Sequence, residues 1–178
     1  MARWGVLRDD GSFATLTFAR EYRHRIEHVW DAIATESGLR EWLLCSYAAI
    51  DGRVGGRFDL VSGPARYRST GTILTWDPPR SLEYEWNVAP VPEMPQGERA
   101  IFRFDLASFD DGHATRLDVT YRRITTQTAR GFLPGLHAYL DRLEAQLDGA
   151  VVPDWMERFV ALRAEYPEWS GHETDSGQ

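Results

Sequence analysis

The amino-acid sequence predicts an α+β fold, in which a curved antiparallel sheet wraps around one long helix near the C-terminus. Two observations carry this prediction. Apolar residues alternate with polar ones in most segments between residues 3 and 122, as in strands with one buried face. Leucines then recur at spacings of three and four between residues 133 and 147, as on a helix. A sheet with one apolar face needs a cover, and only this helix is long enough.

The N-terminal part is predicted to form a hairpin followed by two short helices. Residues 3–8 and 12–22 alternate on either side of an Asp-Asp-Gly turn, which is a hairpin signal. Residues 26–34 then carry apolar side chains at helical spacing. Ser37-Gly38 is expected to break this helix, and a second short helix is predicted over residues 39–44.

From Cys45 onward the chain has the pattern of a meander of antiparallel strands. Asp-Gly and Asp-Pro-Pro sequences separate the alternating segments, as expected for turns. Residues 89–97 hold three prolines and are predicted to form a loop, because proline cannot donate to a strand ladder. The predicted strands of this part cover residues 57–60, 66–76, 81–86, 101–106 and 115–122.

The segment DGRVGGRFDL (51–60) contains three glycines, which allow two interpretations. A glycine-rich phosphate loop must be followed by a helix, and a P-loop also needs Gly-Lys-Ser/Thr. Here a strand pattern follows, so a phosphate site is not expected. We expect Gly52 to serve a turn, and Gly55, Gly56 and Gly71 to allow bends or bulges. Such bends let a sheet curl around a helix and enclose a cavity.

The long C-terminal helix is predicted over about residues 129–149. Proline is tolerated only in the first turn of a helix, so the regular helix is expected to begin near Pro134. Gly149 is expected to end it. A last amphipathic helical segment covers residues 153–166, and the polar tail of residues 170–178 is predicted to be disordered.

Composition and charge limit the classes of function. Residues 1–169 are expected to form one domain with its core at 12–150, because no linker or repeat divides the chain of 178 residues. The net charge of −7 argues against nucleic acid and anionic membranes as partners. Cys45 is the single cysteine, which excludes an intrachain disulfide and a cysteine zinc site. The N-terminus has no apolar signal core, so we expect a cytoplasmic protein without membrane insertion.

The residues His24 to His28 spell H-x-x-E-H, a pattern of one class of zinc enzymes. Such a site needs both histidines on one helix face and a third ligand. Because His24 is predicted to end a strand and the helix to begin near Ile26, the two imidazoles are not expected to meet. His137, on the long helix, is expected at the surface or at a cavity rim. We therefore predict no metal, no cofactor and no catalytic residue.

The inward faces of the predicted strands and of the long helix are rich in aromatic side chains. Each of these could be an ordinary core residue, but as a set facing a helix across a bent sheet they predict the lining of a cavity. A buried tyrosine hydroxyl needs a hydrogen-bond partner, which a ligand could supply. The predicted ligand-binding residues are Phe58, Tyr67, Trp76, Tyr84, Trp86, Phe102, Phe104, Tyr121, Phe132, Leu136, Tyr139 and Leu140.

Several segments in this order resemble the branch of the START/Bet v 1-like (SRPBCC) superfamily that is similar to the activator of Hsp90 ATPase. They are REYRHRIEHVWDAIAT, EW at 41–42, DGRVGGRFDL, STGTILTWDPPRSLEYEW, HATRLDVTY and GFLPGLHAYLDRLEAQLDG. The resemblance covers about residues 12–150. The chain departs from it at His24-Arg25, where members often have Ala-Pro, and at Phe132, where a tryptophan is common. Both departures affect the expected pocket or its rim rather than the fold.

The resemblance implies a helix-grip fold, a curved antiparallel sheet around the C-terminal helix with a cavity between them. The superfamily includes lipid and hormone binders, polyketide cyclases and Hsp90 co-chaperones, and the fold alone does not choose among them. We expect first a protein that binds a small hydrophobic or aromatic molecule, because this function needs only the cavity.

Two other functions stay open at this point. A cyclase-like or aromatase-like enzyme would need an acid–base pair in the cavity, for which Tyr84, Tyr121, Tyr139 and His137 are the candidates. The inward faces show no acidic residue, which weighs against this alternative. A co-chaperone would use an exposed apolar surface to bind an Hsp90-type partner. The loop at 89–97 and the segment after Gly149 could close the cavity or form a homodimer.

Overall fold

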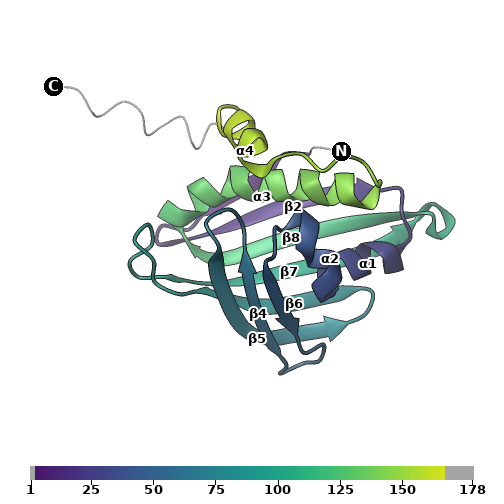
Figure 1. Ribbon diagram of the computed structural model, residues 1–178, viewed down its shortest axis with the longest axis horizontal. Helices are drawn as coiled ribbons and strands as arrows, with labels where there is room; N and C mark the ends of the chain where they lie inside the picture. Colours follow the sequence, from purple (N-terminus) through teal and green to yellow (C-terminus); the bar gives the residue numbers. More distant parts are fainter. Residues whose placement is uncertain (1–2, 167–178) are drawn as a thin grey trace.

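The computed structural model describes residues 3–166 and has the predicted α+β fold (Figure 1). Its eight-stranded sheet has the order β1-β2-β8-β7-β6-β5-β4-β3, and every neighbouring pair is antiparallel. The sheet therefore follows the chain except at one crossover, which brings the last strand beside β2. The predicted disordered tail, residues 170–178, lies outside the described residues.

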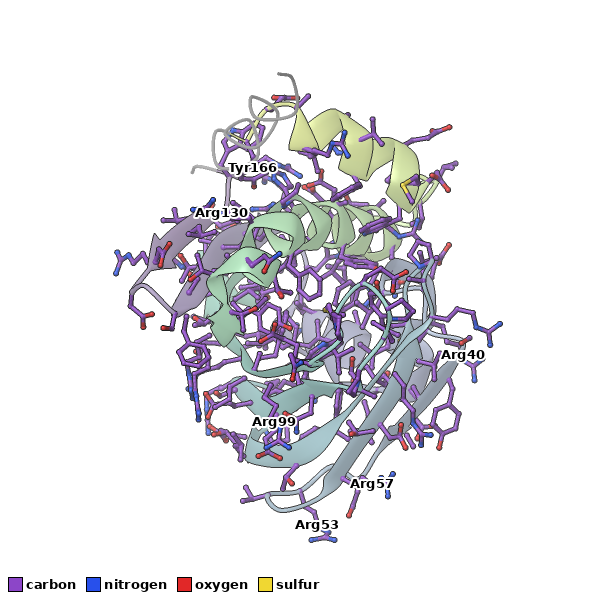
Figure 2. All side chains as sticks on the ribbon, turned by 90° about the vertical axis from the view of Figure 1, so that its left-hand side faces the viewer. Arg40, Arg53, Arg57, Arg99, Arg130 and Tyr166 are labelled. Carbon is purple, nitrogen blue, oxygen red and sulfur yellow. The ribbon has the colours of Figure 1, made fainter. Side chains whose placement is uncertain are left out.

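The strands confirm the predicted alternation. Leu16, Phe104 and Leu117 are completely or almost completely buried, while Arg57 and Arg99 are exposed (Figure 2). The inner face of the sheet is thus apolar and the outer face is rich in arginine. The strands are β1 (Val6–Asp9), β2 (Phe13–Tyr22), β3 (Tyr47–Ile50), β4 (Arg57–Ser62), β5 (Tyr67–Asp77), β6 (Ser81–Val88), β7 (Glu98–Phe109) and β8 (Ala114–Thr125).

Four α-helices and one short turn of 3-10 helix complete the fold. They are α1 (Ile26–Ala34), α2 (Glu36–Trp42), α3 (Thr126–Leu147), α4 (Trp155–Arg163) and η1 (Asp110–Gly112). The long helix α3 packs on the concave side of the sheet, and α4 lies on the other side of α3 (Figure 1). None of the helices in the described part of the chain is both long and apolar enough to cross a membrane.

The prediction that Ser37-Gly38 breaks the first helix was wrong by two residues. The break is at Thr35, whose backbone is extended, with φ −114° and ψ 150°. The Thr35 hydroxyl accepts a hydrogen bond of 3.0 Å from the Gly38 amide, so Thr35 is the N-cap of α2. Ser37 and Gly38 therefore lie in the first turn of α2.

The predicted start of the long helix near Pro134 was also wrong, because α3 begins at Thr126 and Pro134 lies in its interior. An internal proline removes one backbone hydrogen bond and costs about 3 kcal/mol. Leu133 and Leu136, on either side of it, are both buried. Full burial of two leucines contributes about 3–6 kcal/mol, which is enough to offset the proline. Gly149, with φ +64°, follows the end of the helix as predicted.

A buried arginine of α3 fixes the neighbouring elements. Arg142 donates hydrogen bonds to the carbonyl oxygens of Glu41 and Trp42 at the end of α2, at 2.6 and 3.0 Å. It also donates to the carbonyl oxygen of Pro153, just before α4. The same side chain thus caps α2 and holds the chain that leads into α4.

Two of the glycines lie at a turn and at a close approach of two strands; that they bend the sheet stays a prediction. Gly55 has φ +79°, and its amide donates to the Ile73 carbonyl oxygen at 2.8 Å, so the turn before β4 closes against β5. At Gly71 in β5, an added Cβ would collide with the carbonyl oxygen of Glu85 on β6. The strands approach closely there because no side chain separates them.

We expect the substitution Gly71→Ala to destabilise the protein by about 1–3 kcal/mol, the usual cost of adding a methyl group where there is no space. The exposed neighbour Thr72 provides the matched control, and Thr72→Ala should change the free energy of unfolding by less than about 1 kcal/mol. Urea unfolding of both variants measures this. If Gly71→Ala is as stable as Thr72→Ala, the close approach of β5 and β6 does not exclude a side chain at position 71.

Candidate functional site

A cavity of about 1250 Å³ lies between the inner face of the sheet and α3. Sites for small molecules usually measure about 300–1000 Å³, so this space is large enough for a ligand of several rings. Strands β4 to β8 and the turn after β4 form one side of it, and α3 forms the other. Residues of α4 and of the loop 89–97 complete its walls.

Nine of the twelve predicted ligand-binding residues line this cavity. They come from four strands and from one helix, as the alternation and the helical spacing predicted. Whether they bind a ligand stays a prediction. The nine are Tyr67, Tyr84, Trp86, Phe102, Phe104, Tyr121, Phe132, Leu136 and Tyr139.

The other three predicted residues do not line the cavity. Phe58 is buried, and its ring stacks on that of Tyr84 with centroids 4.0 Å apart, so it supports the wall from behind. Leu140 is completely buried in the core, one turn after Leu136. Trp76 instead contacts Trp30 of α1, at 5.2 Å between centroids. The register of β5 changes between Ile73 and Thr75, so the alternation that predicted an inward Trp76 does not extend to it.

The cavity also has walls that were not among the predicted residues. On α4, Trp155 and Phe159 line it with their rings stacked 4.9 Å apart. Trp155 also contacts Tyr139 of α3, and its indole nitrogen donates to the Gly135 carbonyl oxygen at 3.3 Å. The spacing of four residues between two aromatic side chains was the signal in the sequence. Other lining residues outside the prediction are Trp42, Leu43, Ser69, Val88 and Met94.

Two buried hydroxyl groups of the cavity have no hydrogen-bond partner among the described residues. They belong to Tyr121 on β8 and Ser69 on β5. Burial raises the pKa of Tyr121 well above its usual range, and Glu98 raises it further, so this phenol stays protonated. Burial likewise raises the pKa of Tyr84. The cavity thus presents neutral, polar hydroxyl groups in an aromatic wall.

The prediction that the inward faces carry no acidic residue was wrong at Glu98, which is buried at the start of β7. Its carboxylate accepts hydrogen bonds from the amide and the hydroxyl of Thr125, at 3.0 and 2.9 Å. These bonds compensate its burial and explain why a charge is tolerated there. Glu98 does not itself line the cavity; Glu93, on the loop 89–97, does, and is exposed.

The family of the chain follows from its sequence. The sequence model of the family described as "Activator of Hsp90 ATPase homolog 1-like protein" matches residues 23–148. The chain belongs to this family. The prediction from the sequence motifs is therefore confirmed, and the match covers the sheet from β3 to β8 together with α1, α2 and α3. No curated protein matches the chain.

Solved structures of bacterial proteins share this fold. Protein MLL2253 from Mesorhizobium loti is 24% identical, with 76% of this chain and 97% of its own covered and a TM-score of 0.65. CalU16 from Micromonospora echinospora is 18% identical, with 93% and 91% covered and a TM-score of 0.66. The protein encoded by BPP1335 of Bordetella parapertussis is 24% identical, with 89% and 86% covered and a TM-score of 0.65. These likenesses establish the common fold.

The H-x-x-E-H segment of this family member differs from the expectation in one respect. The imidazoles of His24 and His28 do meet, with ring centroids 5.2 Å apart, because the chain turns into α1 immediately after His24. The Nε2 of His24 lies within hydrogen-bond distance of a carboxylate oxygen of Asp148, at 2.7 Å. Among residues 3–166, no group of three or more His, Cys, Asp or Glu side chains could hold a metal ion.

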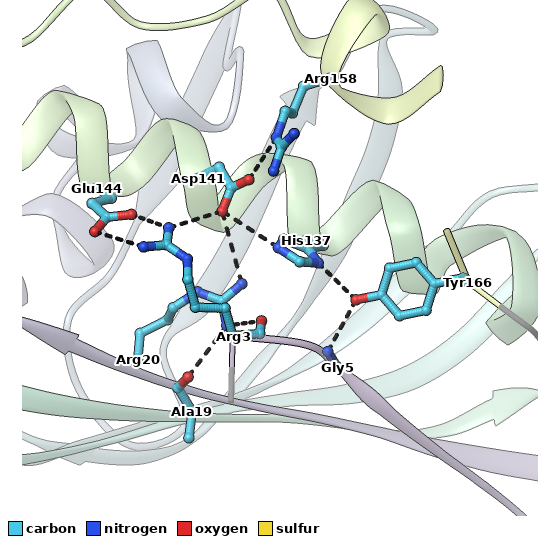
Figure 3. Close-up of polar contacts among 9 residues, drawn as sticks. All are labelled: Arg3, Gly5, Ala19, Arg20, His137, Asp141, Glu144, Arg158 and Tyr166. Atoms are coloured by element: carbon cyan, nitrogen blue, oxygen red, sulfur yellow. Dashed lines mark hydrogen bonds and ion pairs between the residues drawn. The ribbon is translucent and has the colours of Figure 1, made fainter. Parts of the chain in front are cut away.

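The prediction for His137 was wrong as well, because this side chain is only 2% exposed and lies on the face of α3 that does not line the cavity. Its Nδ1 is 2.7 Å from the hydroxyl of Tyr166, and its Nε2 is 3.5 Å from Asp141 (Figure 3). Tyr166 also accepts a hydrogen bond of 3.0 Å from the Gly5 amide. The N-terminal segment, α3 and the chain after α4 therefore meet at His137.

Asp141 is the centre of this buried polar cluster. Its carboxylate pairs with Arg158 of α4 at 2.7 Å and with Arg3 at 3.3 Å, and Arg20 of β2 lies 3.9 Å away (Figure 3). Burial lowers the pKa of His137 to about 4; Asp141 opposes this, and the three arginines reinforce it. His137 is therefore neutral near pH 7.

The depressed pKa of His137 makes the stability depend on pH. Below pH 6.5 the unfolded chain takes up a proton at this position that the folded protein does not accept until about pH 4. The free energy of unfolding should therefore fall between pH 6.5 and 4, with a contribution of up to about 1.4 kcal/mol per pH unit. Urea unfolding at several pH values measures this slope, and His137→Gln should reduce it.

The exposed His113 is the matched control, and His113→Gln should keep the slope of the parent protein. A His137→Gln variant with an unchanged slope would show that other groups cause the pH dependence.

Proposed function

We propose that this protein binds a small apolar or aromatic molecule in the cavity between the sheet and α3. The observation that carries the proposal is the cavity of about 1250 Å³ with aromatic walls from four strands and three helices. An empty apolar space costs stability because its lining atoms lose their packing contacts. A ligand that fills it restores these contacts and removes its own apolar surface from water.

The composition of the walls supports binding rather than catalysis. General acid–base catalysis needs a titrating group within reach of the substrate. Among the described residues that line the cavity there is no histidine, and Glu93 is the single carboxylate. Burial also keeps the phenols of Tyr84, Tyr121 and Tyr139 protonated, because it raises the pKa of each. We therefore propose a binding protein and not a cyclase.

The proposal predicts that the neutral fluorescent probe N-phenylnaphthylamine binds with one site per chain. Three tryptophans line the cavity, namely Trp42, Trp86 and Trp155, so energy transfer from tryptophan to the probe should accompany binding. Leu136→Trp places a larger side chain in the cavity and leaves less space for the probe. It should weaken binding at least about tenfold, which corresponds to a loss of about 1.4 kcal/mol of binding free energy.

Leu74→Trp provides the control, because Leu74 is exposed and does not line the cavity. It should leave the dissociation constant of the probe unchanged. If the parent protein binds no probe, or if both variants bind it like the parent protein, the cavity is not a binding site.

A further inference from the structure

We infer that the ligand is an aromatic molecule with a hydrogen-bond-accepting oxygen, of the chemical class of aryl ketones, and that the Tyr121 hydroxyl donates a hydrogen bond to this oxygen. The inference rests on the proposed function and adds the chemistry of the ligand and the residue that orients it.

The first argument is the hydroxyl group of Tyr121 itself. Tyr121 is only 3% exposed, it lines the cavity, and its hydroxyl oxygen has no hydrogen-bond partner among the described residues. Buried polar atoms in folded proteins almost always have a partner. The neighbouring carboxylate of Glu98 accepts from Thr125 instead. Because the side chain of Tyr121 lines the cavity, we expect the partner of its hydroxyl group to come from there.

The second argument is that this hydroxyl has a fixed direction. The ring of Tyr121 lies 4.9 Å from that of Phe102 and 6.2 Å from that of Phe132, between centroids, and stacks on the latter at 16°. Contacts with these two rings restrain the side chain of Tyr121, so its hydroxyl oxygen has a defined place. A ligand group in that place is oriented by one short, directional bond.

The third argument concerns the polarity of the missing partner. The phenol is protonated, because burial raises its pKa, so it offers a hydrogen atom that needs an acceptor. A buried donor without a partner is rarer than an acceptor with a free lone pair. Glu98 lies close enough to raise the pKa of Tyr121 further, and this negative charge disfavours an anionic group beside the Tyr121 hydroxyl. A neutral carbonyl oxygen meets both requirements.

The fourth argument is the row of rings that surrounds Tyr121. Tyr84 and Phe102 are almost parallel, at 8° with centroids 6.0 Å apart, and Phe104 lies 4.9 Å from Phe102. Rings gain specific energy from other rings in stacked or edge-to-face positions, beyond the burial of area. A rigid aromatic ligand also loses less conformational entropy on binding than a flexible alkyl chain. The wall therefore favours an aromatic ligand over a saturated one.

The test compares fluorenone with fluorene, which have the same ring skeleton and differ by one carbonyl group. Both compete with N-phenylnaphthylamine for the parent protein and for Tyr121→Phe. The substitution should raise the inhibition constant of fluorenone about tenfold, the value of one good hydrogen bond, and change that of fluorene less than about twofold. Tyr121→Phe should also unfold at no lower temperature, because the hydroxyl it removes has no protein partner.

Tyr22→Phe is the matched control. The hydroxyl of Tyr22 is also buried and without a described partner, but Tyr22 does not line the cavity. This variant should bind both competitors like the parent protein. Ser69→Ala removes the second unpartnered hydroxyl of the cavity and should leave the effect of the Tyr121 substitution unchanged.

The outcomes separate this inference from the proposed function. If the probe binds but Tyr121→Phe changes fluorenone and fluorene equally or not at all, the inference is wrong and the binding function stands. A fluorenone effect at Ser69→Ala alone would also overturn it, since the donor would then be Ser69. If neither the probe nor the competitors bind the parent protein, the proposed function is wrong and the inference falls with it.

Discussion

The inner face of the sheet must be buried, and one helix is too narrow to bury it. Eight strands at about 4.8 Å spacing span more than 30 Å, whereas a helix with its side chains is about 10–12 Å wide. Curvature brings part of the sheet onto α3, and α1 and α2 cover another part (Figure 1). The space that is left between these contacts is the cavity, so its existence follows from the mismatch in width.

The helix α3 consequently has two buried faces with different chemistry. One face contributes Phe132, Leu136 and Tyr139 to the cavity. The other face carries His137 and Asp141, which bind the N-terminal segment, β2, α4 and Tyr166 (Figure 3). The carboxylate of Asp141 is surrounded by arginines, so the segments that cover α3 are fixed by ion pairs and not by apolar packing alone.

The sequence was sufficient to predict the fold and most of the aromatic residues of the cavity wall, because both depend on local periodicity. Alternation along β6 and β7 identified Tyr84, Trp86, Phe102 and Phe104. The periodicity of the sequence does not reveal contacts between distant segments. His137 was expected at the surface because helical spacing does not reveal that Tyr166 covers it. The prediction that Trp76 lines the cavity was wrong because a change of register in β5 ends the alternation. The prediction that the long helix begins near Pro134 was wrong because the burial of residues on both sides outweighs the local cost of proline.

The helix α4 lies outside the segment that the family match covers. The segment matched by the family ends at residue 148, yet Trp155 and Phe159 of α4 form part of the cavity wall. A chain with the same sheet and another C-terminal segment would enclose a space of different shape and polarity. The range of molecules that such a scaffold accepts can therefore be altered by exchanging a short terminal helix, without any change in the elements on which folding depends.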